Sequence, residues 1–280
     1  MILAPQPCTR FDAAARERIF GGAILVIPDV SEVAAFVDLL RDRAQAAFAP
    51  FDPPSAQQHL SRDDLTRRCV TLTKEVEGDR AVASSLDAML IGLGADPATT
   101  FRDRLRLRIQ VSGGDLETAR PITLPPHRDT WGSNAMAQVN WWAPLWPLDR
   151  GRTIAFWPEC FDTPVANSSA GWDYDALIAS RKRGEATYPL LPRATAPEDL
   201  GPARPAIIDT GAIMAFSGAH LHAGTVNTTG QVRLSFEFRS VDVEDLRAGR
   251  GAPNADGGAP RMPLHWFRRL GDGASLADAA

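Results

Sequence analysis

The chain has 280 residues, 44% of them hydrophobic and 23% charged, so it can bury one full core but is short for two large domains. Its net charge of -4 gives no general basic field, which argues against a nucleic-acid partner and favours a small molecule. The three cysteines are odd in number and form no CxxC pair, which argues against a disulfide framework or a thiolate zinc site and fits a reducing cytoplasm.

Residues 1–100 predict a helical and mixed segment that supports the rest of the domain. The chain start lacks a basic region before its short apolar opening, so it is a poor secretory signal, and no uncharged apolar run could span a membrane. A short strand is expected over residues 23–27, followed by a helix with Asp29 as its N-cap. A second helical pattern, DRAVASSLDAMLIGLG, is expected to stop at Gly92 and Gly94.

The hydrophobic period then changes to two, which predicts a mainly antiparallel β core over residues 101–245. Apolar Leu105, Leu107, Ile109 and Val111 alternate with Arg104, Arg106, Arg108 and Gln110. Further strand-like segments are MAQVNWWAPLW, RTIAFWP, PAIIDTGAIMAFSGAHLHAGTV and QVRLSFEFRSV. Residues 165–204 form an insertion with one short helix and a proline-rich return, which we expect to lie over a site. Residues 246–280 are loop-rich and expected to be mobile, completing one domain over residues 1–280.

The segment PPHRDTWGSN places His127 and Asp129 two positions apart, just before an apolar stretch. If this segment is extended, their side chains project together while Arg128 points the opposite way. An imidazole and a carboxylate side by side are two ligands of the facial site that holds non-haem Fe(II), which needs one more histidine. Two of the five histidines, His220 and His222, lie together in FSGAHLHAGTVN. The alternative for either histidine is a core position satisfied by a backbone carbonyl, and the alternating polar residues of the next strand, Arg233, Ser235, Glu237 and Arg239, could simply face water.

His127-x-Asp129, a distal histidine before AGTVNTTGQVR and Arg233-x-Ser235 on the last core strand resemble the Fe(II)/2-oxoglutarate-dependent dioxygenases, especially the phytanoyl-CoA-hydroxylase-like branch. The resemblance covers roughly residues 103–241. It implies a mainly β fold with flanking helices and a double-stranded β-helix core, the jelly-roll or cupin-like arrangement, with a metal at its open end.

The resemblance also implies the metal ligands and the cofactors. His127, Asp129 and the distal histidine would bind Fe(II), with 2-oxoglutarate and O₂ as cosubstrates. Of the two distal candidates it favours His222, because the spacing of this residue to Arg233 and the turn HAGTVN match the family. His220 stays open as the alternative.

Three polar residues are expected to bind 2-oxoglutarate. Arg233 would pair with the distal carboxylate, since a guanidinium offers two parallel donors that match a carboxylate. Ser235 would add a hydroxyl donor. Asn140, which shares a strand face with Gln138 and Trp142, would bind the end near the metal, unless it is an amide that bonds to the backbone of the sheet.

A further group of residues is expected to contact the substrate: Trp131, Trp142, Arg108, Gln110 and Arg239. The alternative for the tryptophans is a place in the core. The alternative for the arginines is solvent, or pairing with acids such as Asp103 and Asp115.

The resulting hypothesis is an enzyme that oxidises a C–H bond of a small molecule, such as an amino-acid-like compound or a natural-product intermediate. In related halogenases a small residue replaces the acidic ligand, so Asp129 favours hydroxylation, desaturation or ring formation. The alternatives are a noncatalytic cupin-like metal-binding β-barrel module and a peptide or protein hydroxylase. Arg233 and Ser235 argue against the first, and an insertion that forms a lid argues against the second. The sequence leaves the oligomeric state open.

Overall fold

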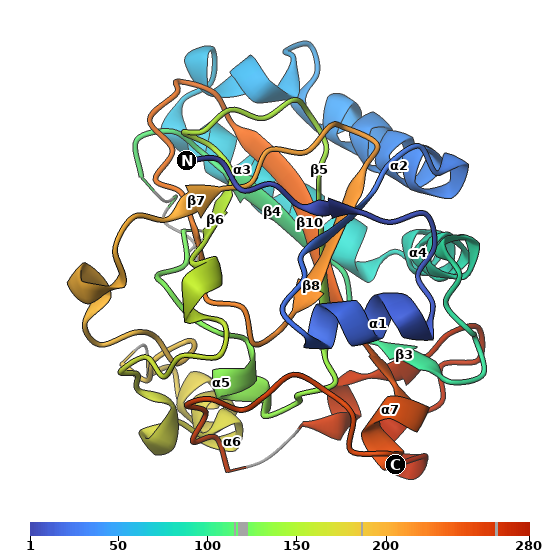
Figure 1. The fold of residues 1–280 in the computed structure, drawn as a ribbon. Coiled ribbons are helices and arrows are strands. Elements are labelled where there is room, and N and C mark those ends of the chain that lie inside the picture. The colour runs from blue at the N-terminus through green and yellow to red at the C-terminus, as the bar shows by residue number, and fades with distance from the viewer. Residues whose placement is uncertain (115, 117–122, 186, 261–262) are drawn as a thin grey trace.

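The computed structural model describes residues 1–114, 116, 123–185, 187–260 and 263–280. The fold is mainly sheet with flanking helices, as the sequence predicted (Figure 1). The helices are α1 (Ala13–Phe20), α2 (Ser31–Phe48), α3 (Arg62–Gly78), α4 (Arg80–Leu93), α5 (Thr130–Ser133), α6 (Tyr174–Lys182) and α7 (Val243–Arg247). The strands are β1 (Gln6–Pro7), β2 (Leu25–Ile27), β3 (Thr100–Arg102), β4 (Arg106–Gln110), β5 (Val139–Pro144), β6 (Ile154–Phe156), β7 (Arg204–Pro205), β8 (Ile213–Ser217), β9 (His222–Gly224), β10 (Arg233–Asp242) and β11 (Arg268–Arg269).

The larger of two sheets is built around β10, which runs through the middle of Figure 1. One edge of β10 pairs with β5, and β8 and then β2 continue the sheet on that side. The other edge of β10 pairs first with β4 and then with β3. All these pairs are antiparallel, whereas β1 joins β2 in parallel, so the sheet is mixed. The long strand thus brings residues from both halves of the chain into register.

The smaller sheet has the order β7–β6–β9 and is extended by His127, which forms a bridge with His222. From β4 onward the chain passes to His127, back to β5, across to β6 and β7, back to β8, across to β9 and back to β10. This alternation between two sheets is the predicted double-stranded β-helix order. Hydrogen bonding between the described strands does not close the two sheets into one barrel.

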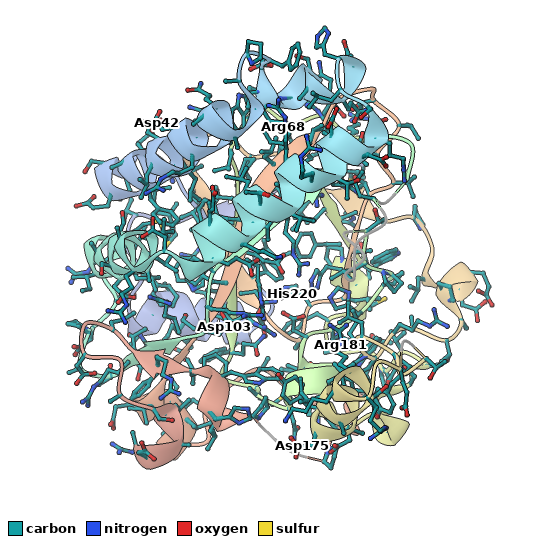
Figure 2. The ribbon with its side chains drawn as sticks, turned by 180° about the vertical axis from the view of Figure 1, so that it is seen from behind. Asp42, Arg68, Asp103, Asp175, Arg181 and His220 are labelled. Carbon is teal, nitrogen blue, oxygen red and sulfur yellow. The ribbon has the colours of Figure 1, made fainter. Side chains whose placement is uncertain are left out.

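Helices α2, α3 and α4 cover one face of the large sheet, and Figure 2 shows α2 and α3 across the back of the molecule. The predicted alternation in β4 is confirmed, because Leu105, Leu107, Ile109 and Val111 are all buried in the core that these helices share. Trp141 of β5 lies in the same core. Trp142, its neighbour, packs on the other side with Phe156 of the small sheet, so the polar face of β4, β5 and β10 lies between the sheets.

One helix prediction was wrong in its start, and one helix was missed. Asp29 is not an N-cap: it has a left-handed φ of 55°, and Val30 precedes α2 without a side-chain cap. Helix α3 was not predicted at all. Helix α4 continues through Gly92, the first of the two expected stops, and ends at Gly94, whose φ of 109° is a conformation that glycine adopts without strain.

The insertion forms α6 and a return to β7, as predicted, and no described helix is long and apolar enough to cross a membrane. The C-terminal segment is loop-rich, but the expectation of mobility is not met around Asp256. The Asp256 carboxylate accepts hydrogen bonds from Arg128, Trp131 and the backbone of Val165. These contacts join the tail to the insertion and to the HxD segment.

Candidate metal centre

Three side chains from distant parts of the chain converge between the two sheets. Each of His127, Asp129 and His222 offers one ligand atom, and these atoms lie within 4.8 Å of one another. The two imidazole ring centroids are 4.3 Å apart, and His127 Nε2 is 3.5 Å from Asp129 Oδ1. A site of two imidazoles and one carboxylate matches the ligands of a non-haem Fe(II) centre.

The backbone that presents Asp129 is not the extended strand that the sequence suggested. Asp129 has helical angles, φ -64° and ψ -32°, and its carbonyl accepts the backbone N–H of Gly132 and Ser133 at the start of α5. His127 is paired with β9, so the chain turns between the two ligands. The convergence therefore comes from a strand that ends in a helical turn. Arg128 does point away, toward Phe161 and Thr163 just before the insertion and toward the tail.

The tautomers of both histidines follow from their hydrogen bonds. His127 Nδ1 lies 2.8 Å from the carbonyl oxygen of Pro125, and His222 Nδ1 lies 3.0 Å from that of His220. A carbonyl only accepts, so each Nδ1 carries the proton and each Nε2 keeps a free lone pair for a metal. Burial, with the nearby His127, lowers the pKa of His222 to about 4, so this ligand is neutral at neutral pH.

The carboxylate is held ionised. Burial raises the pKa of Asp129, but the contact with His127 and the positive charge of Arg239 outweigh it and leave the pKa well below the usual range. Asp129 Oδ2 also accepts a hydrogen bond from Asn140 Nδ2 at 2.8 Å. Asn140, which we expected to bind 2-oxoglutarate, therefore faces the acidic ligand.

His220 is not part of this group of ligands. It is 1% exposed, with Nδ1 3.2 Å from the carbonyl of Ser217 and Nε2 3.1 Å from the carbonyl of Gly22. Both ring nitrogens face backbone carbonyls and neither faces the other ligands. Of the two distal candidates, the structure brings His222 to the other ligands.

A second polar group lies deeper between the sheets, around Arg233. Its side chain is 3% exposed, and it donates from one terminal nitrogen to the carbonyl of Thr153 at 2.6 Å, while its Nε has no partner. The buried Ser235 Oγ and the Oε1 of Gln110, which pairs with Arg233 across β4 and β10, also lack partners. Burial lowers the pKa of Arg233 to about 10, so it remains a cation at neutral pH. Native proteins rarely leave such groups unsatisfied, and a carboxylate would satisfy the guanidinium and the hydroxyl together.

The other arginines of the polar sheet face have acidic partners. Arg108 pairs with Glu237, Arg239 donates to Asp103 at 2.7 Å, and Arg106 lies 3.7 Å from Glu77. Asp115, the other acid expected to pair with these arginines, lies outside the described residues. Among the described residues, Arg233 has no acid within ion-pair distance. Of these arginines, Arg233 is thus the one whose positive charge no described acidic side chain balances.

The expected substrate residues are placed differently from one another. Trp131 has no exposed surface and donates to Asp256 at 2.6 Å, so it faces the tail. Trp142 lies between the sheets with its indole N–H unpartnered. Gln110 donates to Thr123 and to the carbonyl of Thr225. Arg108 and Arg239 remain partly exposed beside their acids.

The sequence analysis gave no role to Gln138, Asp256 or Glu237. Gln138 was placed on the face of Asn140, and this shared face was the available signal. Glu237 lies on the same alternating face of β10 as Arg233 and Ser235, and 35% of its side chain is exposed. No local pattern marks Asp256, since its partners are far away in the sequence.

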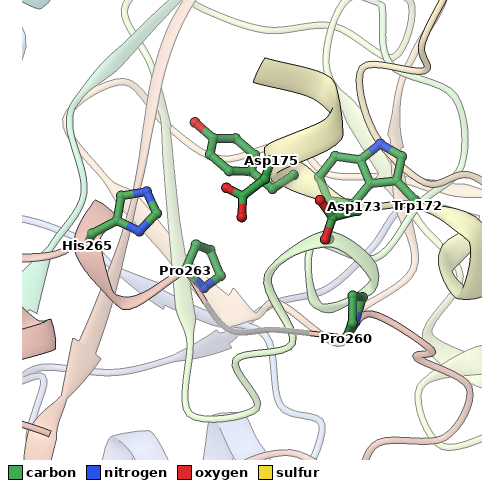
Figure 3. Close-up of a pocket in the computed structure, with 8 residues that line it drawn as sticks. Trp172, Asp173, Asp175, Pro260, Pro263 and His265 are labelled. Atoms are coloured by element: carbon green, nitrogen blue, oxygen red, sulfur yellow. The ribbon is translucent and has the colours of Figure 1, made fainter. Parts of the chain in front are cut away.

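A cavity of about 120 Å³ lies where the insertion meets the tail (Figure 3). Its lining comprises Gly132, Trp172, Asp173, Tyr174, Asp175, Pro260, Pro263 and His265. Gly132 belongs to α5, directly after the metal-binding turn. The insertion and the tail therefore meet beside α5.

No family model matches the chain, and no curated protein matches it. Several solved structures do. The non-heme alpha-ketoglutarate-dependent carbocyclase SnoK from nogalamycin biosynthesis is 14% identical over 95% of this chain and 98% of that chain, with a TM-score of 0.42. EvdO2 from Micromonospora carbonacea var. aurantiaca, complexed with 2-oxoglutarate, is 14% identical over 86% and 94%, with a TM-score of 0.45.

The match to a third structure, EvdMO1, spans 58% of this chain but 31% of that chain, with a TM-score of 0.31. All three TM-scores are below 0.5 and all identities are below 25%. These structures therefore assign no function to this chain, and its function has to be inferred from its own geometry.

Proposed function

We propose that this chain is an Fe(II)/2-oxoglutarate-dependent oxygenase that hydroxylates a C–H bond of a small molecule, with 2-oxoglutarate converted to succinate and CO₂. The observation that carries the proposal is the unpaired, buried Arg233 behind the His127, Asp129 and His222 group. A site that only stores a metal has no need of a carboxylate anchor. When bound, Fe(II) with 2-oxoglutarate and O₂ supplies an oxidant that can attack an unactivated C–H bond.

The three side chains fit iron because two imidazoles and one carboxylate are the ligands of a facial non-haem Fe(II) site, and such a site would leave positions for further ligands. His127 and His222 would each bind through Nε2, and Asp129 through a carboxylate oxygen. The free positions are those that the keto acid and O₂ require. The role of the protein is to orient these ligands and to keep the space between the sheets closed to bulk water.

Strand β9 links the group of ligands to the surroundings of Arg233. The Thr153 carbonyl that accepts from Arg233 also accepts the backbone N–H of Thr225 at 3.0 Å. Thr225 comes three residues after His222, which at about 3.3 Å per residue is roughly 10 Å along the chain. A dicarboxylate with its keto acid at the metal would place its other carboxylate near Arg233 and Ser235.

The small-molecule substrate is supported by the parts of the chain that surround the centre. The insertion and the tail meet beside α5, and Asp256 ties both to the HxD segment. A protein substrate would need an open groove instead. An amino-acid-like compound or a natural-product intermediate fits such a site, and Trp142, Arg108 and Arg239 are the residues we propose to contact it.

The proposal is tested by calorimetric titration of 2-oxoglutarate into Mn(II)-loaded protein. Replacing Arg233 with Ala removes the anchor, so we expect a loss of at least tenfold in 2-oxoglutarate affinity with Mn(II) affinity unchanged. Arg104→Ala, which removes an exposed arginine near β4, is the matched control and should titrate like the wild type. Equal 2-oxoglutarate affinity in the Arg233 variant would reject the cosubstrate assignment and favour a cupin-like metal-binding module.

A further inference from the structure

The two oxygens of Asp129 have different surroundings. Oδ1 lies 3.5 Å from His127 Nε2, on the side of the other ligands. Oδ2 is contacted by two side-chain amides of β5 and the turn before it: Asn140 Nδ2 at 2.8 Å and Gln138 Nε2 at 3.4 Å. Both amides are buried. The carboxylate is therefore restrained on the side that faces the large sheet.

The orientation of both amides follows from the carboxylate. An ionised carboxylate only accepts, so Asn140 must turn its NH₂ to Asp129 and its oxygen away. That oxygen accepts from Gln138 Nε2 at 2.7 Å, which fixes the second amide in turn. Beyond these hydrogen bonds, the second side-chain oxygen, Gln138 Oε1, is buried without a partner. The fold leaves this oxygen unsatisfied while both amide nitrogens point toward the metal ligand.

A glycine makes room for the arrangement. A Cβ at Gly218 would lie 2.8 Å from Gln138 Nε2, closer than a real Cβ is found. Gly218 also donates its N–H to the Gln138 carbonyl at 3.2 Å and accepts the N–H of Thr130 at 3.2 Å. One residue thus sets the position of Gln138 and of the turn that carries Asp129.

We propose that Asn140 and Gln138 are positioning residues that hold Asp129 as a ligand through one oxygen only. A carboxylate that used both oxygens would occupy a position that 2-oxoglutarate or O₂ needs. Hydrogen bonds to Oδ2 hold that oxygen back and leave Oδ1 for the metal. The inference rests on the proposed metal centre and replaces the expected contact of Asn140 with the cosubstrate.

The test measures metal binding rather than turnover. Asn140→Ala removes the donor to Oδ2, and we expect Mn(II) affinity of the metal-free protein to fall about 10- to 100-fold, as is typical when the partner of a ligand is lost. Gly218→Ala leaves every ligand and Asn140 unchanged but displaces Gln138, and we expect a smaller loss. The visible spectrum of the Co(II)-loaded Asn140 variant should differ from that of the wild type as Asp129 changes its binding mode.

The matched control is Ser240→Ala, on the opposite face of neighbouring β10. It removes one buried hydrogen bond, from Trp141 Nε1 to Ser240 Oγ at 2.8 Å, and should leave Mn(II) affinity and the Co(II) spectrum unchanged. Wild-type affinity and spectrum in both the Asn140 and Gly218 variants would overturn the inference. So would an equal loss of affinity in the Ser240 control.

Two further results separate this inference from the proposed function. If His127→Ala binds Mn(II) like the wild type, the metal centre itself is wrong. If Asn140→Ala does not fold, a crystal structure of the Mn(II)-loaded wild type decides. Asp129 bound through one oxygen with Asn140 on the other supports the inference, and Asp129 bound through both oxygens overturns it.

Discussion

His127 and His222 exchange a reciprocal pair of backbone hydrogen bonds, each 3.0 Å long, across the edge of the small sheet. The pair fixes two imidazoles, 95 positions apart in the chain, with their ring centroids 4.3 Å from each other. The same backbone supplies the carbonyl of His220 that orients His222. Strand pairing thus holds the two imidazoles of the candidate centre next to each other.

This arrangement predicts different outcomes for the two neighbouring histidines. His222→Ala removes a ligand and should lose iron, measured as iron content after anaerobic reconstitution. His220→Ala removes a buried ring held by two backbone carbonyls, so it should lower the melting temperature while the folded protein still binds iron. Iron lost only from the His220 variant would reverse the assignment.

Replacement of Ser235 should weaken 2-oxoglutarate binding without lowering the stability of the free protein. Its Oγ is buried without a partner, so Ser235→Ala removes no hydrogen bond from the free protein, and the melting temperature should not fall. In the complex, the lost bond to a carboxylate is worth about 1.5 to 3 kcal/mol, so 2-oxoglutarate affinity should drop roughly 10- to 100-fold. Calorimetry and thermal unfolding check the two halves. An unchanged affinity would remove Ser235 from the cosubstrate site.

Asp256 should stabilise the metal-binding segment from a distance. Asp256→Asn leaves the buried Arg128 without an anionic partner, and breaking a buried pair costs about 3 to 5 kcal/mol. Chemical denaturation should show this loss, and limited proteolysis should cut the tail near residue 256 faster. Asp272→Asn is the control, because that aspartate pairs with Arg269 on the surface, and its unfolding curve should match the wild type.

The buried thiol of Cys69 should be inert in the folded protein. Burial raises its pKa to about 12, so almost none of it is thiolate at pH 8, the form that reacts. A disulfide reagent added at pH 8 should leave Cys69 unmodified until denaturant is added, as mass spectrometry of the tryptic peptide would show. Labelling of Cys69 in the native protein at pH 8 would contradict the burial of this thiol.

The sequence predicted the β core, and it pointed to the candidate site residues because they stand out from their strands. Arg233 and Ser235 interrupt an apolar strand, and His127 and Asp129 precede one. Helix α3 was missed because its buried residues, Leu65, Cys69, Leu72 and Val76, form a narrow stripe among charged residues. The expected cap at Asp29 failed because its left-handed backbone directs the chain into α2 without a side-chain bond.

Long-range polar contacts could not be predicted from the sequence. Asp256 is separated from Trp131 by 125 positions and lies in a glycine- and proline-rich stretch with no periodic pattern. The contact of Asn140 with Asp129 depends on the helical turn at Asp129, which the expected extended strand did not include. Pattern reasoning selected the residues that we propose for the site, while their hydrogen-bond partners depended on the fold.

The most direct test of the proposed iron site is a spectroscopic titration without oxygen. Fe(II) and then 2-oxoglutarate are added to the metal-free protein. We expect the weak visible charge-transfer band of the iron–keto acid chelate to appear in the wild type and to be absent from His127→Ala and Asp129→Ala. No band in the wild type, or a band of equal strength in both variants, would contradict the proposed iron site.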